Sequence, residues 1–238
     1  MIEGKSVLAV VPARGGSKGI RLKNLRQVGG VPLVAKVGSV IKELPFIDLA
    51  VVSTDHDDIA QVAQTAGLQV PFRRPESLSG DQIGDLDVLT HALQQCESIY
   101  DKVFDVVLML QPTSPLREAG HVEACVSKLI LENWDSVWTV SRTDSKAHPL
   151  KQLYLDGTGT LEFWDPAAAS IIARQQLSPV YHRNGIAYAF TRDCLLTQKS
   201  IKGARAGALV VEGEHVSIDT NWDIDLVEFI LSRQTTKN

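Results

Sequence analysis

The sequence predicts an α/β fold in which a mostly parallel, twisted sheet lies between two layers of helices. As far as residue 140, continuous apolar runs of strand length alternate with segments that have the apolar spacing of helices. This alternation is typical of a parallel sheet that is covered on both faces. The 238 residues, of which 44% are hydrophobic, suit a single domain spanning 1–238 with a small insertion.

Three strands are expected at 6–11, 47–52 and 104–110, where nearly unbroken apolar runs are each followed by polar or turn residues. The segments between and after them place apolar residues three or four positions apart, which is the spacing of one helix face. Helices are therefore predicted over 31–44, 57–66, 85–96 and 118–131, and a fourth strand over 136–140.

The pattern changes after residue 140. The segment 141–179 has scattered polar residues, two short alternating runs (152–155 and 160–164) and an alanine-rich stretch, which indicates an insertion or a subunit contact. Regular structure is expected again as strands over 186–190 and 208–211 and a helix over 222–233.

Composition narrows the classes of function. A net charge of -4 and a pI near 5.9 argue against a basic nucleic-acid-binding protein. The three cysteines have no metal-ligand or disulfide spacing, which favours free thiols in a reducing compartment. The first residues lack the layout of a signal peptide, and no apolar run reaches the ~18 residues of a membrane span. We therefore expect a cytoplasmic protein with no nucleic-acid or membrane partner.

The loop after the first strand concentrates cations and glycines. Its cations are Arg14, Lys18, Arg21 and Lys23, and its glycines are Gly15, Gly16 and Gly19. Glycines let backbone N–H groups approach an anion, while lysine and arginine add positive charge. A solvated basic turn is the alternative, but the position directly after a buried strand favours a phosphate site. Residues 15–19 also fit the G-x-S-x-G pattern of serine hydrolases, which leaves Ser17 as a nucleophile in a minor alternative.

Further polar clusters follow other predicted strands, and ligands of such folds bind at this edge of the sheet. The amide of Gln111 offers a hydrogen-bond donor and an acceptor to a base or a sugar hydroxyl. Arg117 is about equally suited to bind a phosphate or simply to lie near the start of the next helix. The pair Arg73-Arg74 suits an acidic ligand or an exposed turn, and 76–84 is a candidate lid. Two arginines and an amide near a turn suit a carboxylate-bearing ligand: Arg174, Arg183 and Asn184. The alternative is that these residues belong to a polar surface loop.

Two carboxylates near the C-terminus complete the candidates. Asp219 and Asp223 follow a predicted strand, and hard carboxylates in that position suit Mg²⁺ held together with substrate phosphates. The alternative is helix capping, with Asp219 or Thr220 at the N-terminus of the last helix.

Taken together, four segments resemble the acylneuraminate cytidylyltransferases, or CMP-sialic acid synthetases. The matching segments are 13–19 with Lys23-Asn24, 110–117, 174–177 and Asn184-Gly185, and the resemblance extends over 7–225. It implies a Rossmann-like nucleotidyltransferase fold and the reaction of CTP with an acidic nine-carbon sugar, which gives a CMP-sugar and pyrophosphate with Mg²⁺.

The resemblance also implies roles for individual residues. CTP would be bound by Arg14, Gly15, Gly16, Ser17, Lys18, Lys23, Asn24 and Arg74. The sugar would be bound by Gln111, Arg174 and Asn184. Arg14, Lys18, Lys23 and Asp219 would act in catalysis, and Asp219 with Asp223 would bind the metal. The family is usually dimeric, and its counterpart of 141–179 crosses to the neighbouring subunit and helps to complete that subunit's site.

Two departures from the family leave the substrate open. Ser217 stands where the sialic acid enzymes often have the first Asp of an Asp-x-Asp pair, and Asp223 is a possible substitute. His182 replaces an arginine that several relatives place two residues before the Asn-Gly. The alternatives are a Kdo-type or other sugar nucleotidyltransferase, a serine hydrolase using Ser17, and a non-catalytic nucleotide-binding module.

Overall fold

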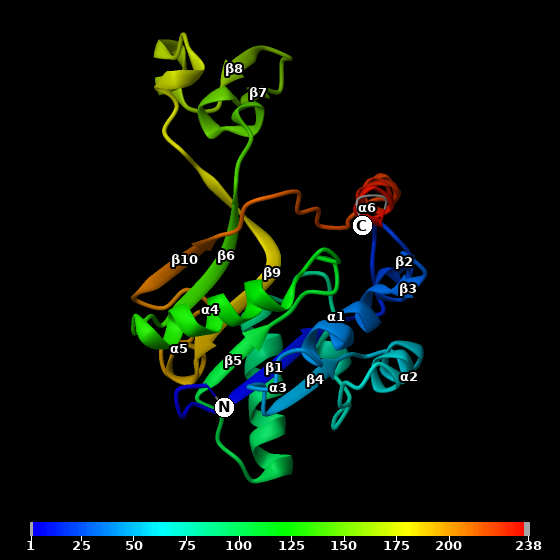
Figure 1. Ribbon diagram of the computed structural model, residues 1–238. Helices are drawn as coiled ribbons and strands as arrows, with labels where there is room; N and C mark the ends of the chain where they lie inside the picture. The colour runs from blue at the N-terminus through cyan, green and yellow to red at the C-terminus, as the bar shows by residue number, and fades with distance from the viewer. Residues whose placement is uncertain (1, 236–238) are drawn as a thin grey trace.

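The structure, a computed structural model, describes residues 2–235 and contains a six-stranded sheet (Figure 1). The strands run in the order β10-β6-β9-β5-β1-β4, and β9 is antiparallel to both of its neighbours. Their bounds are β1 Val7–Pro12, β4 Leu49–Ser53, β5 Val106–Met109, β6 Ser136–Arg142, β9 Tyr181–Thr191 and β10 Ala206–Val210. The predicted mostly parallel sheet is thereby confirmed.

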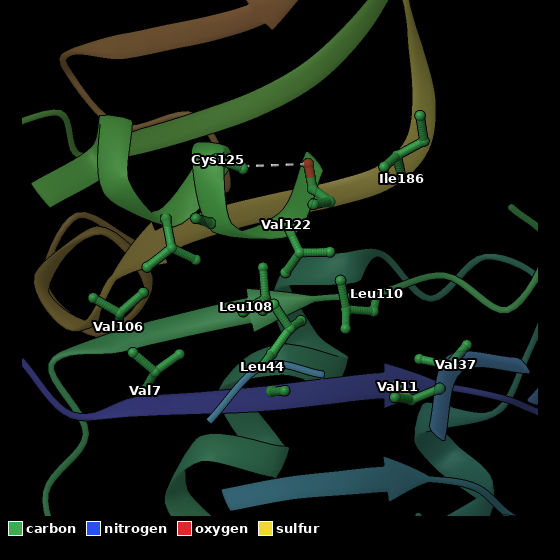
Figure 2. Packing of buried hydrophobic residues seen from close by; sticks show 14 of the residues in the cluster. Val7, Val11, Val37, Leu44, Val106, Leu108, Leu110, Val122, Cys125 and Ile186 are labelled. Atoms are coloured by element: carbon green, nitrogen blue, oxygen red, sulfur yellow. Dashed lines mark hydrogen bonds between the residues drawn. The ribbon is translucent and has the colours of Figure 1, made fainter. Parts of the chain in front are cut away.

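Helices cover both faces of this sheet, as predicted. The covering helices are α1 Leu33–Ile41, α2 Asp57–Thr65, α3 Asp85–Tyr100, α4 Ala119–Leu131 and α5 Arg192–Leu196, whereas α6 Asn221–Thr235 packs against the loop after β1. One core cluster joins the sheet to α1, α2 and α4, with α4, which carries Val122 and Cys125, packed over β6 and β9 (Figure 2). A second cluster joins the opposite face to α3 and α5. The result is the three-layer architecture that the alternating apolar pattern predicted.

Some element bounds differ from the expected ones. The predicted helix over 31–44 begins only at Leu33, because β3 (Val31–Pro32) pairs with β2 (Gln27–Val28) in a short hairpin. β9 is far longer than the expected 186–190, since its first half extends beyond β5 and pairs only with β6. The short helix α5 lies in a segment that carried no clear periodic signal.

The segment between β6 and β9 extends away from the sheet as an arm (Figure 1). It holds a two-stranded sheet of β7 (Leu153–Leu155) and β8 (Leu161–Phe163). It also holds the short 3-10 helices η3 Ser145–Ala147, η4 Pro149–Lys151, η5 Pro166–Ser170 and η6 Arg174–Gln176. The predicted insertion, 141–179, thus corresponds to this arm.

A third apolar cluster fastens the C-terminal segment to the loop after β1. Ile20 and Val28 pack there with Ile218 and with Val227 of α6. Because α6 lies beside the β2–β3 hairpin (Figure 1), this cluster brings the segment before α6 close to the glycine-rich loop. None of the helices within residues 2–235 has the length and apolar character needed to cross a membrane.

Candidate active site

A cavity of about 670 Å³ opens at the C-terminal edge of the sheet. Its walls come from the loop after β1, the segment 74–88, the loop after β5 and the segment before α6. Eight of the predicted site residues line it: Arg14, Ser17, Lys18, Lys23, Asn24, Arg74, Gln111 and Asp219. The rule that ligand groups gather at strand ends therefore located the cavity from sequence.

Two cations of the first loop meet a carboxylate across the cavity. Asp81, in the predicted lid, accepts Nη2 of Arg14 and Nζ of Lys18, each at 2.8 Å. The hydrogen bond from Lys18 is the main cause of a lowered pKa of Asp81. Asp81 therefore occupies the position in which an anionic ligand would meet the same two cations.

Lys23 joins the first loop to the C-terminal segment. Its Nζ donates to the carbonyl oxygen of Ile218 at 2.9 Å and to Oδ1 of Asp219 at 2.8 Å. Lys23 is largely covered, whereas the side chain of Asp219 is 74% exposed. The site thus pairs a fixed cation with an accessible carboxylate.

The shape of the first loop is held by neighbouring polar groups. The backbone N–H of Gly15 donates to Oδ1 of Asp55 at 2.8 Å, and Nδ2 of Asn24 donates to the carbonyl oxygen of Arg14 at 3.0 Å. A Cβ on Gly15 would lie 2.8 Å from the ring of His56. Gly15 and Gly16 do not line the cavity, so the structure assigns Gly15 to the fold of the loop.

Gly19 allows the first loop to approach the metal candidate closely. A Cβ at this position would lie 2.5 Å from the carbonyl oxygen of Asp219, which is a backbone atom that cannot rotate away. Gly19→Ala is therefore expected to displace Asp219 and to lower turnover about 100-fold, the order of loss for a misplacement near 1 Å. The measurement is the pyrophosphate release that the sequence resemblance implies, with Gly120→Ala as control because its Cβ would meet nothing within 4 Å. Wild-type turnover in Gly19→Ala would contradict the proposed role of this contact.

Arg73 and Arg74 lie in different environments. Arg74 is buried and lines the cavity, and its Nε donates to Oγ of Ser53 at 3.0 Å. Burial lowers the pKa of Arg74 to about 10, although nearby Asp55 opposes this effect. Arg73 is half-exposed and pairs with Asp57 on the outside. Only Arg74 can therefore reach a ligand in the cavity.

The loop after β5 is held in place by a buried arginine. Arg117 donates from Nη2 to the carbonyl oxygens of Gln111 at 2.6 Å and Gly185 at 3.0 Å, and from Nε to that of Ile186. Burial lowers the pKa of Arg117 to about 9. Of the two interpretations of Arg117, the structural one agrees with these contacts. Gly185 has a φ of +73° and approaches so closely that a Cβ would lie 2.7 Å from Oε1 of Gln111.

Known proteins identify the family of the chain. A family model described as cytidylyltransferase matches residues 8–234, which is nearly the whole chain.

The chain belongs to the cytidylyltransferase family.

Relatives of this cytidylyltransferase confirm the resemblance found in the sequence. A CMP-N,N'-diacetyllegionaminic acid synthase from Legionella pneumophila is 32% identical over 92% of each chain. An N-acylneuraminate cytidylyltransferase from Danio rerio is 31% identical over 94% of this chain, which spans only 50% of that longer protein. The structure of CMP:2-keto-3-deoxy-manno-octonic acid synthetase complexed with CTP superimposes with a TM-score of 0.67 at 17% identity and supports the fold.

Besides Gly15 and Gly16, three further predicted site residues of this cytidylyltransferase lie outside the cavity. Asn184 is buried, and its side chain bonds Thr139 at 2.7 Å and Ser141 at 3.1 Å, so it supports β9 beside the site. Arg174 lies in the arm and lines a separate cavity. Oδ2 of Asp223 accepts the backbone N–H groups of Asp219 at 2.9 Å and Thr220 at 2.7 Å, which is a cap of α6.

The serine hydrolase alternative finds little support in this site. Ser17 lies in an irregular loop that leads to a single 3-10 turn (η1, Lys23–Leu25), whereas a nucleophile elbow leads directly into a helix. Within residues 2–235, no hydrogen bond joins the Ser17 side chain to a histidine.

Sequence reasoning missed two carboxylates of the cavity, Asp81 and Asp85. In the sequence, Asp81 follows the arginine pair within the candidate lid, and Asp85 is the first residue of a predicted helix. An acidic residue in the first turn is so common a helix signal that Asp85 gave no separate indication of a site.

Proposed function

We propose that this enzyme transfers the cytidylyl group of CTP to the anomeric hydroxyl of an acidic nine-carbon sugar and releases pyrophosphate. The observation that carries the proposal is the meeting of Arg14, Lys18 and Lys23 with Asp219 and Gln111 around one cavity. The three cations suit a triphosphate, and the amide of Gln111 suits a sugar hydroxyl or carboxylate.

The proposed reaction is an in-line displacement at the α-phosphorus. The sugar hydroxyl oxygen forms the new bond to phosphorus, the bond to pyrophosphate breaks, and the proton leaves to solvent. Such a step depends on positioning and charge neutralisation more than on covalent catalysis. When the substrate binds, Arg14 and Lys18 would release Asp81 and pair with the phosphates, whose charge they would offset. Lys23 would stay paired with Asp219.

Magnesium is part of the proposal, and the donor set suits it. Mg²⁺ usually binds one or two carboxylates together with substrate phosphates and water. Asp219 offers an accessible hard oxygen beside the cations, and Ser217 lines the same cavity. Asp223 is the second candidate ligand, although its Oδ2 already caps α6. When bound, the metal would neutralise phosphate charge next to Asp219.

Asp219→Asn tests this metal assignment. The substitution keeps the size of the side chain but removes the charge, so we expect the Mg²⁺ concentration for half-maximal pyrophosphate release to rise at least about tenfold. Asp105→Asn is a control because Asp105 is a part-exposed carboxylate paired with Lys5 at the opposite edge of the sheet. An unchanged Mg²⁺ titration would favour helix capping as the only role of this segment.

We further propose a homodimer in which the arm of each subunit completes the site of its partner. The arm exposes a set of large apolar side chains that a partner could cover: Leu153, Leu155, Leu161, Phe163, Trp164 and Ile172. Arg174 lines a cavity in the arm that shares no residue with the candidate active site of the same chain. A contribution of Arg174 to the partner's sugar site agrees with this separation.

Mixing two inactive variants tests the exchange between subunits. Lys18→Ala and Arg174→Ala are each expected to lose most activity, but their heterodimer would contain one intact site if Arg174 acts across the interface. Since half of randomly mixed dimers are heterodimers, about one quarter of wild-type activity should return. No recovery after subunit exchange would place Arg174 in its own subunit's site or outside catalysis.

Pyrophosphate release with each of the four nucleoside triphosphates and a panel of acidic sugars tests the function as a whole. Turnover only with CTP and nine-carbon sugars is expected. Turnover with an eight-carbon sugar such as Kdo would favour the alternative nucleotidyltransferase, and CTP binding without turnover would favour a binding module. We propose a cytoplasmic location, which agrees with the three free, buried cysteines.

A further inference from the structure

A second charged pair lies beside the cavity, at the end formed by β9. Asp85 lines the cavity from the start of α3, and Nη1 of Arg183 on β9 lies 3.8 Å from its Oδ2. The guanidinium of Arg183 also lies over the ring of Trp138, with its carbon 5.4 Å from the ring centroid. Two contacts thus hold Arg183 next to the cavity.

This pair retains unused hydrogen-bonding capacity. A separation of 3.8 Å is too long for a hydrogen bond, and no other hydrogen bond within residues 2–235 involves either side chain. Asp85 is 31% exposed and Arg183 is 53% exposed. Burial raises the pKa of Asp85, and the charge of Arg183 opposes this effect. A ligand with a donor and an acceptor close together would satisfy both groups.

The order of the strands assigns this pair to one end of the substrate. Arg74, the candidate nucleotide contact, is bonded to Ser53 at the end of β4. Arg183 lies on β9, which β5 and β1 separate from β4. The phosphate-binding loop follows β1, between these two ends. The sugar attacks the α-phosphorus opposite the pyrophosphate, and the nucleoside is attached through a third substituent, so the sugar and the nucleoside occupy different parts of the cavity. With Arg74 at the nucleotide end, we assign the β9 end to the sugar.

The hydrogen-bonding chemistry of Asp85 and Arg183 limits which part of the sugar can bind between them. Two groups only 3.8 Å apart can bind adjacent hydroxyls, one donating to the carboxylate and the other accepting from the guanidinium. An acylamino group fits less well because its N–H and its carbonyl point in opposite directions in a trans amide. The exocyclic side chain of the sugar would lie far from the phosphates, and the β9 end of the cavity is the part that is far from them.

We propose that Asp85 and Arg183 determine sugar specificity by binding a vicinal diol on the exocyclic side chain of the acidic sugar. This inference rests on the proposed function. It predicts that the enzyme favours sugars whose side chain ends in adjacent hydroxyls over sugars that lack them.

The test compares N-acetylneuraminate with its analogue whose side chain is shortened by two carbons to a single hydroxyl. For Arg183→Gln and Asp85→Ala, kcat/KM with N-acetylneuraminate should fall about 10- to 100-fold, the range for hydrogen bonds to charged groups. Values for the shortened sugar and the KM for CTP should change less than about threefold. Arg205→Gln is the matched control, because Arg205 lies over Trp134 in the same kind of contact, 5.2 Å from the ring centroid, on an exposed surface.

Each possible result has a distinct meaning. Equal losses with both sugars, or a raised KM for CTP, would overturn the inference, because the pair would then act on the fold or on the nucleotide. Turnover of other acidic sugars without turnover of N-acetylneuraminate would also overturn it. Absence of pyrophosphate release with any acidic sugar in the wild-type enzyme would instead overturn the proposed function itself. An unchanged thermal unfolding midpoint in the variants shows that the losses do not arise from misfolding.

Discussion

Replacing Lys18 by alanine is expected to lower kcat/KM for pyrophosphate release from CTP by about 100- to 1000-fold, the usual loss when one electrostatic contact to a transition state is removed. Lys18 lines the cavity, and its ammonium group reaches Asp81 at 2.8 Å, so it lies where the phosphates are proposed to bind. The folded state should change little, because the side chain is 79% exposed. A large loss of activity with an unchanged unfolding midpoint would therefore identify a functional cation.

The matched control for Lys18 is Lys5→Ala. Lys5 is also an exposed lysine paired with an aspartate, at 3.4 Å from Asp105, but it lies at the opposite edge of the sheet. We expect wild-type turnover in this variant. Wild-type turnover in Lys18→Ala as well would refute the assignment of the first loop to phosphate binding.

Arg117→Met should destabilise the protein by about 3 kcal/mol or more, since it removes the guanidinium donor from the buried carbonyl oxygens of Gly185 and Ile186, and one of two donors from that of Gln111. For a chain of this size that corresponds to a fall in Tm of about 6–12 °C. Gln111 should lose its fixed position in the same variant, so the KM for the sugar should also rise. Thermal unfolding and steady-state kinetics measure the two effects separately.

Arg205→Met provides the comparison for this prediction. Both arginines lose their guanidinium, but that of Arg205 lies on an exposed surface over Trp134. Its loss should cost less than about 1 kcal/mol, as is usual for surface substitutions. A similar fall in Tm for both variants would show that the carbonyl contacts of Arg117 contribute little.

Several site residues were predictable because they follow strands directly. Arg14 and Lys18 come after β1 and Gln111 after β5, and parallel strands bring their carboxyl ends to one edge. The role of Arg117 stayed open in the sequence, because an arginine at this position suits a phosphate contact or the start of the next helix about equally. Only the tertiary structure, in which β9 lies close to the loop after β5, shows that Arg117 donates to carbonyl oxygens of β9.

The sequence by itself determined the three-layer fold, the position of the glycine-rich loop and the family, since all three depend on local patterns and on their order along the chain. The tertiary structure decided which charges meet. Lys23 pairs with Asp219 across 196 positions, and Arg183 reaches Asp85 only because β9 runs antiparallel beside β5. Such contacts depend on how the chain returns to the sheet edge, and no local spacing of residues encodes that path.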